Sequence, residues 1–253
     1  MTVKELYDKF DSLIPKSLSC EWDNDGLMCS PDENHYVKRV LCSLDATEQV
    51  IDYAIKNSFD LIITHHPLIF SKLSSVTADD YVSEKVIKLI KNGISLFSFH
   101  TRADMHNDGV NVRLSKILNM KETERFGPEG EKMGIVGYVE ETTLSDFCNT
   151  VKSAIGSPCI LASGNRRVHR RAILGGDGKD FVNSAKAVGA DTYMSGRISY
   201  NITLLAPEIG INLVEAGHFY TEKHIAEMFA EYTKTFCPEI YTETVESNTI
   251  NIY

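Results

Sequence analysis

Two adjacent histidines, His65 and His66, follow a short apolar run and precede Pro67. The run, residues 61–63, lacks polar alternation and predicts a buried strand. Proline cannot continue a sheet ladder, so the histidines should lie where the strand opens into a loop. Open α/β sheets place ligands at that edge. Neighbouring imidazoles there suit two metal ions, although a purely structural pair of histidines would have the same sequence.

Two further segments carry similar groups after predicted strands. His100 and Asp104 follow a strand at residues 95–99, and Asp104 could instead brace the turn at residues 107–109. His218 and Glu222, four residues apart, follow a strand at residues 212–214. If Glu222 lies in the first turn of the next helix, the two side chains face one point. Without a metal, Glu222 could simply complement the helix dipole.

Imidazole and carboxylate ligands without thiolates suit zinc, iron, manganese or cobalt, whereas calcium and magnesium prefer all-oxygen sites. Five such ligands exceed the three that a catalytic zinc normally takes. They suffice for two divalent ions bridged by one carboxylate, an arrangement typical of metal-dependent hydrolysis. The candidate ligands are His65, His66, Asp104, His218 and Glu222.

Alternating strand and helix patterns must position these residues. They predict an α/β fold of two lobes, with mainly parallel sheets covered by helices. The turn-forming residues 127–130 suggest a division into lobes 1–127 and 128–253, with the metal site between them. The predicted strands are 39–44, 61–63, 95–99, 134–139, 172–174, 192–194, 212–214 and 245–252. The predicted helices are 2–14, 47–57, 81–92, 110–118, 144–155, 181–188 and 222–232.

Composition narrows the function classes. The 253 residues have a formal net charge of −9, which argues against a general nucleic-acid binder. The six cysteines contain no CxxC pair and are typical of the reduced thiols of a cytoplasmic protein. The N-terminus lacks the apolar stretch of a signal peptide, and no run of residues is apolar enough to span a membrane. We therefore expect a cytoplasmic protein without a membrane partner.

The chain resembles the Nif3-like family of dinuclear-metal-centre proteins, labelled GTP cyclohydrolase 1 type 2 homologs. The resemblance rests on Glu-Trp-Asp-Asn-Asp-Gly-Leu at 21–27, Thr-His-His-Pro at 64–67, His-Thr-Arg-Ala-Asp at 100–104, Gly-Val-Asn at 109–111, Gly-Gly at 175–176, Gly-Ala-Asp at 189–191, and Gly217, His218 and Glu222. It implies that His66, Asp104 and Glu222 hold one metal ion, and that His65, His218 and the same Glu222 hold the other. It also implies a ring-shaped homohexamer whose metal sites face an internal cavity.

Two positions depart from the family pattern. Many relatives have Asn-Leu where this chain has Arg102-Ala103, and this arginine could bind an anionic substrate or face solvent. Relatives often have Tyr-His where this chain has Tyr200-Asn201, and the missing histidine weakens any transferred activity.

Four weaker signals lie elsewhere. His100 could orient a ligand through a hydrogen bond or transfer a proton. The only tryptophan, Trp22, is expected to be buried. Gly-Gly-Asp-Gly at 175–178 could cradle a phosphate or form a tight turn. The basic cluster at 166–171 could attract nucleic acid or form a solvated turn.

The leading hypothesis is a two-metal hydrolase acting on a nucleotide or phosphoester-like substrate. A non-catalytic protein that stores, delivers or senses metal would use the same ligands. A ring-shaped nucleic-acid-associated protein is a third hypothesis, against which the net acidity argues. The sequence identifies neither the substrate, the native metal, nor a general acid or base.

Overall fold

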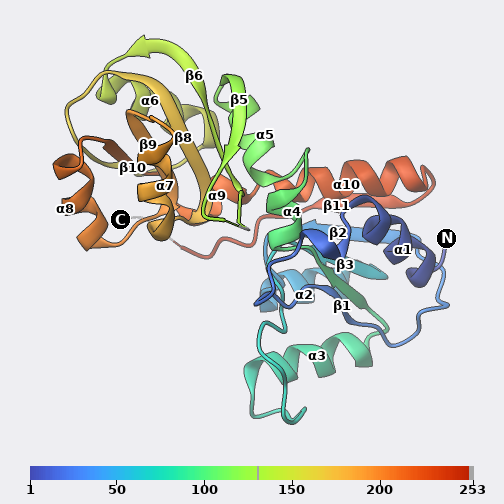
Figure 1. Ribbon diagram of the computed structural model, residues 1–253. Helices are drawn as coiled ribbons and strands as arrows, with labels where there is room; N and C mark the ends of the chain where they lie inside the picture. The colour runs from blue at the N-terminus through green and yellow to red at the C-terminus, as the bar shows by residue number, and fades with distance from the viewer. Residues whose placement is uncertain (130, 251–253) are drawn as a thin grey trace. The chain divides into compact units, whose positions relative to one another are not determined.

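The structure, a computed structural model, describes residues 1–129 and 131–250 and forms two compact units. Unit 1 comprises Met1–His106 and Ile225–Thr249. Unit 2 comprises Asn107–His224 and also takes in Ile250. The predicted α/β class is confirmed, because each unit is a sheet covered by helices (Figure 1).

The sheet of unit 1 has five strands in the order β1-β4-β3-β2-β11. All neighbours are parallel except β1, which runs antiparallel along the edge. The central strands are continuous apolar or small-residue runs because helices cover both faces. Their bounds are β1 Gly26–Cys29, β2 Arg39–Ser43, β3 Leu61–Thr64, β4 Ser95–Ser98 and β11 Tyr241–Thr244.

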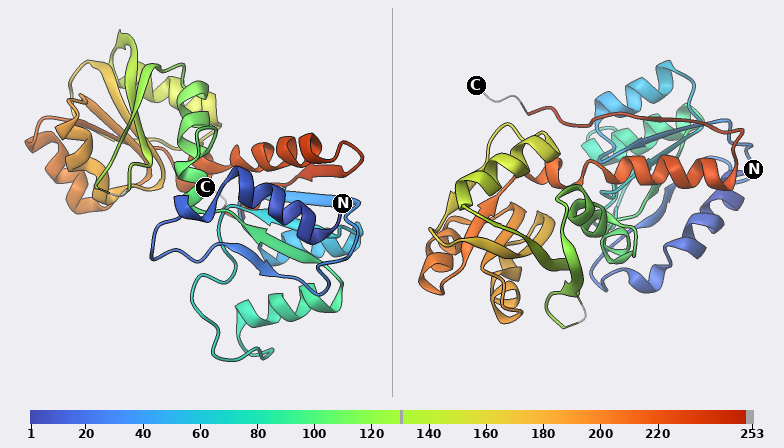
Figure 2. Two further views of the ribbon diagram at one scale, coloured as in Figure 1. Left: turned by 45° about the vertical axis from the view of Figure 1, so that its right-hand side comes forward. Right: turned by 90° about the horizontal axis from the view of Figure 1, so that it is seen from above.

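Two pairs of helices cover this sheet. Helices α1 (Val3–Leu13) and α10 (Ile225–Phe236) pack on one face, and α2 (Glu48–Lys56) and α3 (Tyr81–Lys91) pack on the other (Figure 2). Helix α1 begins with a capping box, in which Thr2 and Glu5 each accept the other's backbone N–H. The short segments η1 (Lys16–Leu18) and α4 (Thr101–Met105) complete the unit.

The sheet of unit 2 has six strands in the order β5-β6-β8-β9-β10-β7. Only β8, β9 and β10 are mutually parallel, so this sheet is mixed and not mainly parallel. The strands are β5 Lys121–Phe126, β6 Gly134–Thr142, β7 Leu161–Ser163, β8 Val168–Asp177, β9 Thr192–Arg197 and β10 Asn212–Glu215.

Helices α5 (Val110–Ile117) and α6 (Leu144–Ile155) cover one face of this second sheet through a shared apolar core. The remaining helical segments are η2 Lys179–Phe181, α7 Val182–Ala187, α8 Tyr200–Glu208 and α9 His218–Glu222. Helix α6 starts at an N-cap threonine and ends at Gly156, whose φ of 69° closes the helix in the left-handed region.

The compact units divide the chain differently from the predicted boundary at residue 127. Helix α5 and strand β5 precede that boundary but belong to unit 2. Helix α10 and strand β11 follow it but belong to unit 1, because β11 pairs in parallel with β2. Of the predicted linker 127–130, residue 130 lies outside the described residues.

Sequence reasoning misplaced several elements. The predicted strand 245–252 is wrong for residues 245–250, which have no regular structure, and residues 251–252 lie outside the described residues. The edge strand is instead β11, which ends before Val245. Strands β1, β5 and β7 were not predicted, because short edge strands carry little apolar pattern. In the described part of the chain, no helix has the length and apolar character needed to cross a membrane.

The side chain of Arg102 does not face solvent, since it is fully buried, and its charge is paired with carboxylates of the chain itself. Its Nη1 donates to Asp11 at 2.6 Å and to the Ile14 carbonyl at 2.9 Å. Its Nε lies 3.2 Å from Asp25, whose carboxylate is also fully buried. This ion pair ties the segment before β1 to helix α4.

We predict that Asp25→Ala destabilises the protein by about 3–5 kcal/mol, because removing one member of a buried ion pair leaves the other poorly compensated. Denaturant unfolding measures the change. Asp8→Ala is the matched control, since it removes an exposed ion pair with Lys4 and should change stability little. Equal effects of the two substitutions would contradict a structural role for the buried pair.

Candidate metal centre

The register of the unit 1 sheet brings its histidines together. Ser43, Thr64 and Ser98 form one row across β2, β3 and β4. His65 lies one residue beyond this row, and His66 and His100 lie two residues beyond it. All three imidazoles therefore gather at the carboxyl ends of parallel strands, where α/β sheets bind ligands.

The three rings form one cluster. Their centroids are 5.0 Å apart for His65 and His66, 5.2 Å for His65 and His100, and 5.6 Å for His66 and His100. One nitrogen from each ring lies within 4.8 Å of the other two. His65 is fully buried, while the other two are half-buried.

Hydrogen bonds on Nδ1 fix the two adjacent histidines. Nδ1 of His65 lies 2.9 Å from the Phe99 carbonyl, and Nδ1 of His66 lies 2.7 Å from Asp45 Oδ1. Because a carbonyl and a carboxylate can only accept, both Nδ1 atoms carry the proton. In its neutral form each ring therefore presents its lone pair on Nε2, the usual arrangement for a histidine that binds metal.

His100 is held in the same way by Asp23, whose Oδ1 lies 2.9 Å from the ring Nδ1. Burial alone would lower the pKa of His100, but the bond to Asp23 and the charge of Asp104 outweigh it and raise this pKa above its ordinary value. Burial acts in the opposite sense on Asp23, yet its bonds to His100 and Thr101 hold the Asp23 pKa well below the usual range. The structure therefore places His100 beside the two candidate ligands, with its ring orientation fixed.

Asp104 lies in helix α4, not in the predicted loop, and is 8% exposed. Its Oδ2 is 3.9 Å from Nε2 of His65. The turn at residues 107–109 is braced instead by Asp108, which pairs with Arg113 at 2.6 Å. Unit 1 thus brings together His65, His66 and Asp104 of the candidate ligands, with His100 beside them.

Unit 2 holds the other two candidate ligands. His218 and Glu222 are the first and last residues of α9, and His218 Nε2 lies 2.9 Å from Glu222 Oε2. The prediction that Glu222 starts a helix over 222–232 is wrong, because α9 ends at Glu222 and α10 begins at Ile225. The four-residue spacing nevertheless sets both side chains on one face of the short helix.

Gly176 makes room for Glu222. A Cβ on Gly176 would lie 2.3 Å from Glu222 Oε1, and its φ of +70° also favours glycine. The N–H of Gly176 donates to Thr221, and that of Gly175 donates to the Asn111 side chain. These bonds occupy the N–H groups that a phosphate cradle would need, so the glycine pair serves close packing against α9.

Some residues around the cluster escaped sequence reasoning. Asp45 lies two residues beyond the end of β2, and His66 lies two residues beyond the paired end of β3. This equal spacing was the sequence signal that could have predicted their contact. Trp22 is 54% exposed and not buried as predicted. Its ring lies 6.1 Å from that of His100 and 6.3 Å from that of Phe70.

The basic cluster at 166–171 does not form an open basic face. Arg167 pairs with Glu141 at 3.0 Å, and Arg170 pairs with Glu124 at 2.6 Å. Arg171 is buried in β8. Two of the predicted surface charges are therefore neutralised and a third is withdrawn from solvent.

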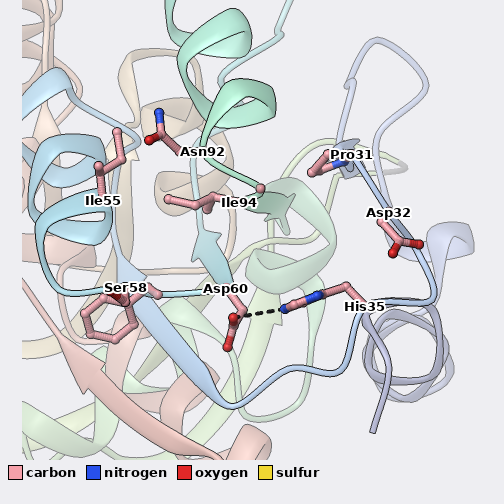
Figure 3. Close-up of a pocket in the computed structure, with 10 residues that line it drawn as sticks. Pro31, Asp32, His35, Ile55, Ser58, Asp60, Asn92 and Ile94 are labelled. Atoms are coloured by element: carbon pink, nitrogen blue, oxygen red, sulfur yellow. Dashed lines mark hydrogen bonds and ion pairs between the residues drawn. The ribbon is translucent and has the colours of Figure 1, made fainter.

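A separate cavity of about 320 Å³ lies at the opposite, amino ends of β3 and β4 (Figure 3). There His35 Nε2 contacts Asp60 Oδ1 at 3.0 Å, and Asp60 Oδ2 accepts the N–H groups of Lys38 and Arg39. Asp60 thus closes the loop before β2 by hydrogen bonds, and this cavity contains none of the candidate ligands.

The donor groups of both units fit a divalent first-row metal ion. Imidazole nitrogens and carboxylates without thiolates are the ligands that zinc, iron, manganese and cobalt accept. The hydrogen bonds that the Nδ1 atoms make are the support that metal-binding histidines normally have. Neither unit alone has all five candidate ligands.

Comparison with known proteins finds one family by sequence and similar folds among solved structures. A model of the Duf34/NIF3 (NGG1p interacting factor 3) family matches residues 1–251. A Clostridium perfringens protein named GTP cyclohydrolase 1 type 2 homolog is 34% identical, covering 92% of each chain. A hypothetical protein of Staphylococcus aureus has a similar crystal structure, with a TM-score of 0.89, 25% identity and coverage of 100% of this chain and 99% of that one. A Bacillus cereus protein related to NIF3 gives a TM-score of 0.88 at 23% identity, covering 100% and 99%.

We predict that Asp23→Asn lowers the pKa of His100 in metal-free protein, because the substitution removes the negative charge that opposes burial. A pH titration of the His100 ring signals by NMR measures it. Asp32→Asn removes the same charge from an exposed loop of unit 1 and should leave His100 unchanged. An unaltered His100 titration in Asp23→Asn would show that the charge of Asp23 does not control this ring.

We predict that Gly176→Ala destabilises the protein by about 1–3 kcal/mol more than Gly93→Ala, because overpacking adds to the backbone strain. The two glycines have nearly equal φ, +70° and +71°, but a Cβ on Gly93 would meet nothing within 4 Å. Denaturant unfolding of both variants isolates the contact with Glu222. Equal destabilisation would mean that Glu222 moves aside freely.

Proposed function

Because the chain belongs to the Duf34/NIF3 family, we propose that His65, His66, Asp104, His218 and Glu222 together bind two divalent metal ions. We propose further that the protein is a metal-dependent hydrolase of a nucleotide or phosphoester-like substrate. The observation that carries the proposal is the imidazole cluster of unit 1, in which hydrogen bonds anchor Nδ1 of His65 and of His66 and leave Nε2 of each as the candidate ligand atom. Purely structural histidines would not need this convergence.

The family resemblance assigns His66, Asp104 and Glu222 to one ion, and His65, His218 and Glu222 to the other. The 3.9 Å between His65 Nε2 and Asp104 Oδ2 favours a different division, in which these two share an ion. In both divisions Glu222 would help to hold both ions, which is why five side chains would be enough for two. Its low exposure of 4% suits a carboxylate that serves two cations.

When bound, two divalent ions supply activation of water and stabilisation of negative charge on oxygen. The chain's own contribution is orientation. Asp45 and the Phe99 carbonyl hold the His66 and His65 rings, and Asp23 holds the His100 ring. Since Asp23 occupies Nδ1 of His100, Nε2 is the atom that can bond to a substrate oxygen or donate a proton to it.

Two exposed aromatic rings support a substrate with a planar base. Trp22 and Phe70 are 54% and 52% exposed, and both rings lie within 6.4 Å of the His100 ring. Such rings offer a surface on which a heteroaromatic group can stack. The name of the Clostridium perfringens relative makes GTP the first nucleotide to assay.

A non-catalytic protein that stores, delivers or senses metal would bind through the same ligands, so turnover is the discriminating observation. The homohexamer that the resemblance implies remains part of the proposal. For a nucleic-acid-associated ring, the ion pairs of Arg167 and Arg170 leave little support in the described structure.

We predict that purified protein saturated with metal holds about two ions per chain, and that His65→Ala and Glu222→Ala each hold far fewer. Elemental analysis after removal of loose metal measures this. His169→Ala is the matched control, because His169 is exposed and its Nδ1 bonds to the Val139 carbonyl, away from the candidate ligands. Unchanged metal content in Glu222→Ala would exclude the bridging carboxylate.

The wild type and the same variants also distinguish an enzyme from a metal carrier. GTP, other nucleotides, phosphoesters and cyclic amides are offered to the metal-loaded protein. Turnover that is lost in Glu222→Ala but kept in His169→Ala supports the hydrolase. Full metal binding with no turnover of any of these substrates supports the carrier.

A further inference from the structure

Arg171, in the middle of β8, is a buried cation without a partner carboxylate. It is 2% exposed, and within residues 1–129 and 131–250 no carboxylate lies within ion-pair distance of its guanidinium. Its Nη2 donates to the Leu118 carbonyl at 2.9 Å, whereas its buried Nε has no acceptor in the same part of the chain. The guanidinium stacks 4.5 Å from the ring centre of Phe147.

Such an arrangement is costly for the folded protein. A buried charge is normally paired, and an apolar side chain of similar size is commonly more stable at such a position. Burial lowers the pKa of Arg171 to about 10, against a weak opposing effect of Asp191, so the group is still charged at neutral pH. One carbonyl bond and one aromatic contact leave most of its donors without an acceptor among the described residues.

Arg171 lines a cavity of about 330 Å³ on the face of the unit 2 sheet that α5 and α6 cover. The cavity also has a second cation, Lys121, and one carboxylate, Glu140. Val139 and the ring of Phe147 supply apolar walls. The residues that line the cavity therefore carry a net positive charge. The guanidinium of Arg171 is the most deeply buried of these charged groups.

This cavity is distinct from the candidate ligands in unit 2. Arg171 pairs with Thr192 at the start of β9. Gly176, which packs against Glu222, lies five residues further along the same strand. Five residues of extended strand span about 16 Å, so the two sites are well separated along β8.

We propose that the cavity is a binding site for a small anionic compound, one with a carboxylate or phosphate group attached to an apolar body. The planar fork of Arg171 matches two oxygens of such a group, and the residue lines the cavity in which they would lie. Lys121 adds a second positive charge at the cavity wall. The apolar body packs against Phe147 and Val139, as in small-molecule sites that combine apolar walls with a few polar anchors.

The test is an NMR titration of the Arg171 Nε–H signal in metal-free protein, assigned by its loss in Arg171→Lys. Benzoate and phenyl phosphate are the probes for the two anion types, and chloride at equal ionic strength is the reference. We expect a saturable shift with one or both probes, with an apparent Kd of about 1 mM or tighter. Benzoate alone, phenyl phosphate alone, or both producing this shift identifies the anion class.

Calorimetry with the responding probe then compares variants. Arg171→Met keeps an apolar side chain over Phe147 and should weaken binding by about tenfold or more. Arg167→Met, which removes an exposed arginine paired with Glu141, should bind as the wild type does. Lys121→Met changes an exposed residue and should weaken binding by a smaller factor.

No saturable shift of the Nε–H signal with either probe would overturn the proposal, as would equal affinity in Arg171→Met and wild type. If Arg171→Met fails to fold, the wild-type titration and Lys121→Met still decide, because neither disturbs the core. Metal-free protein keeps the outcome separate from that of the metal centre.

Discussion

The unit 1 cluster depends on one constraint: Nδ1 of each imidazole must meet a hydrogen-bond acceptor. The sheet supplies the acceptors of His65 and His66 through its register. The Phe99 carbonyl lies one residue beyond the row that joins β3 to β4, as His65 does, and the two meet. Asp45 lies two residues beyond the same row, as His66 does, and they also meet. A slip of one residue between β2 and β3 would separate His66 from its carboxylate.

Unit 2 positions its candidate ligands by a different means. A single short helix, α9, presents both His218 and Glu222, so their relation depends on helical spacing and not on strand register. The helix must approach β8 closely, and Gly176 allows it because no Cβ intervenes. Thr221, between the two ligands, bonds to the N–H of Gly176 and fastens the helix to the strand. Close backbone packing thus takes the place of the hydrogen-bond acceptors used in unit 1.

Sequence reasoning located the strand ends that carry the histidines, because buried parallel strands are unbroken apolar runs that end sharply at polar residues. It could not assign β11, whose residues alternate little and are partly exposed at the sheet edge. Arg102 was misread because a charged residue looks solvent-exposed until its partners Asp11 and Asp25, about 90 and 80 positions away, are known. Trp22 was misread because its apolar size predicts burial, whereas its ring lies exposed beside those of Phe70 and His100.

The order of the elements along the chain has a consequence for how the protein is made. All strands of the unit 2 sheet fall between residues 121 and 215, so this sheet can form while the ribosome is still extending the chain. The other sheet began earlier but lacks its edge strand β11 and covering helix α10 until residue 244 has emerged. Until then the side of β2 that β11 will cover has unpaired backbone groups, an edge prone to wrong pairing. The half that is started first is therefore completed last, contrary to the usual N-terminal-first order of domain folding during synthesis.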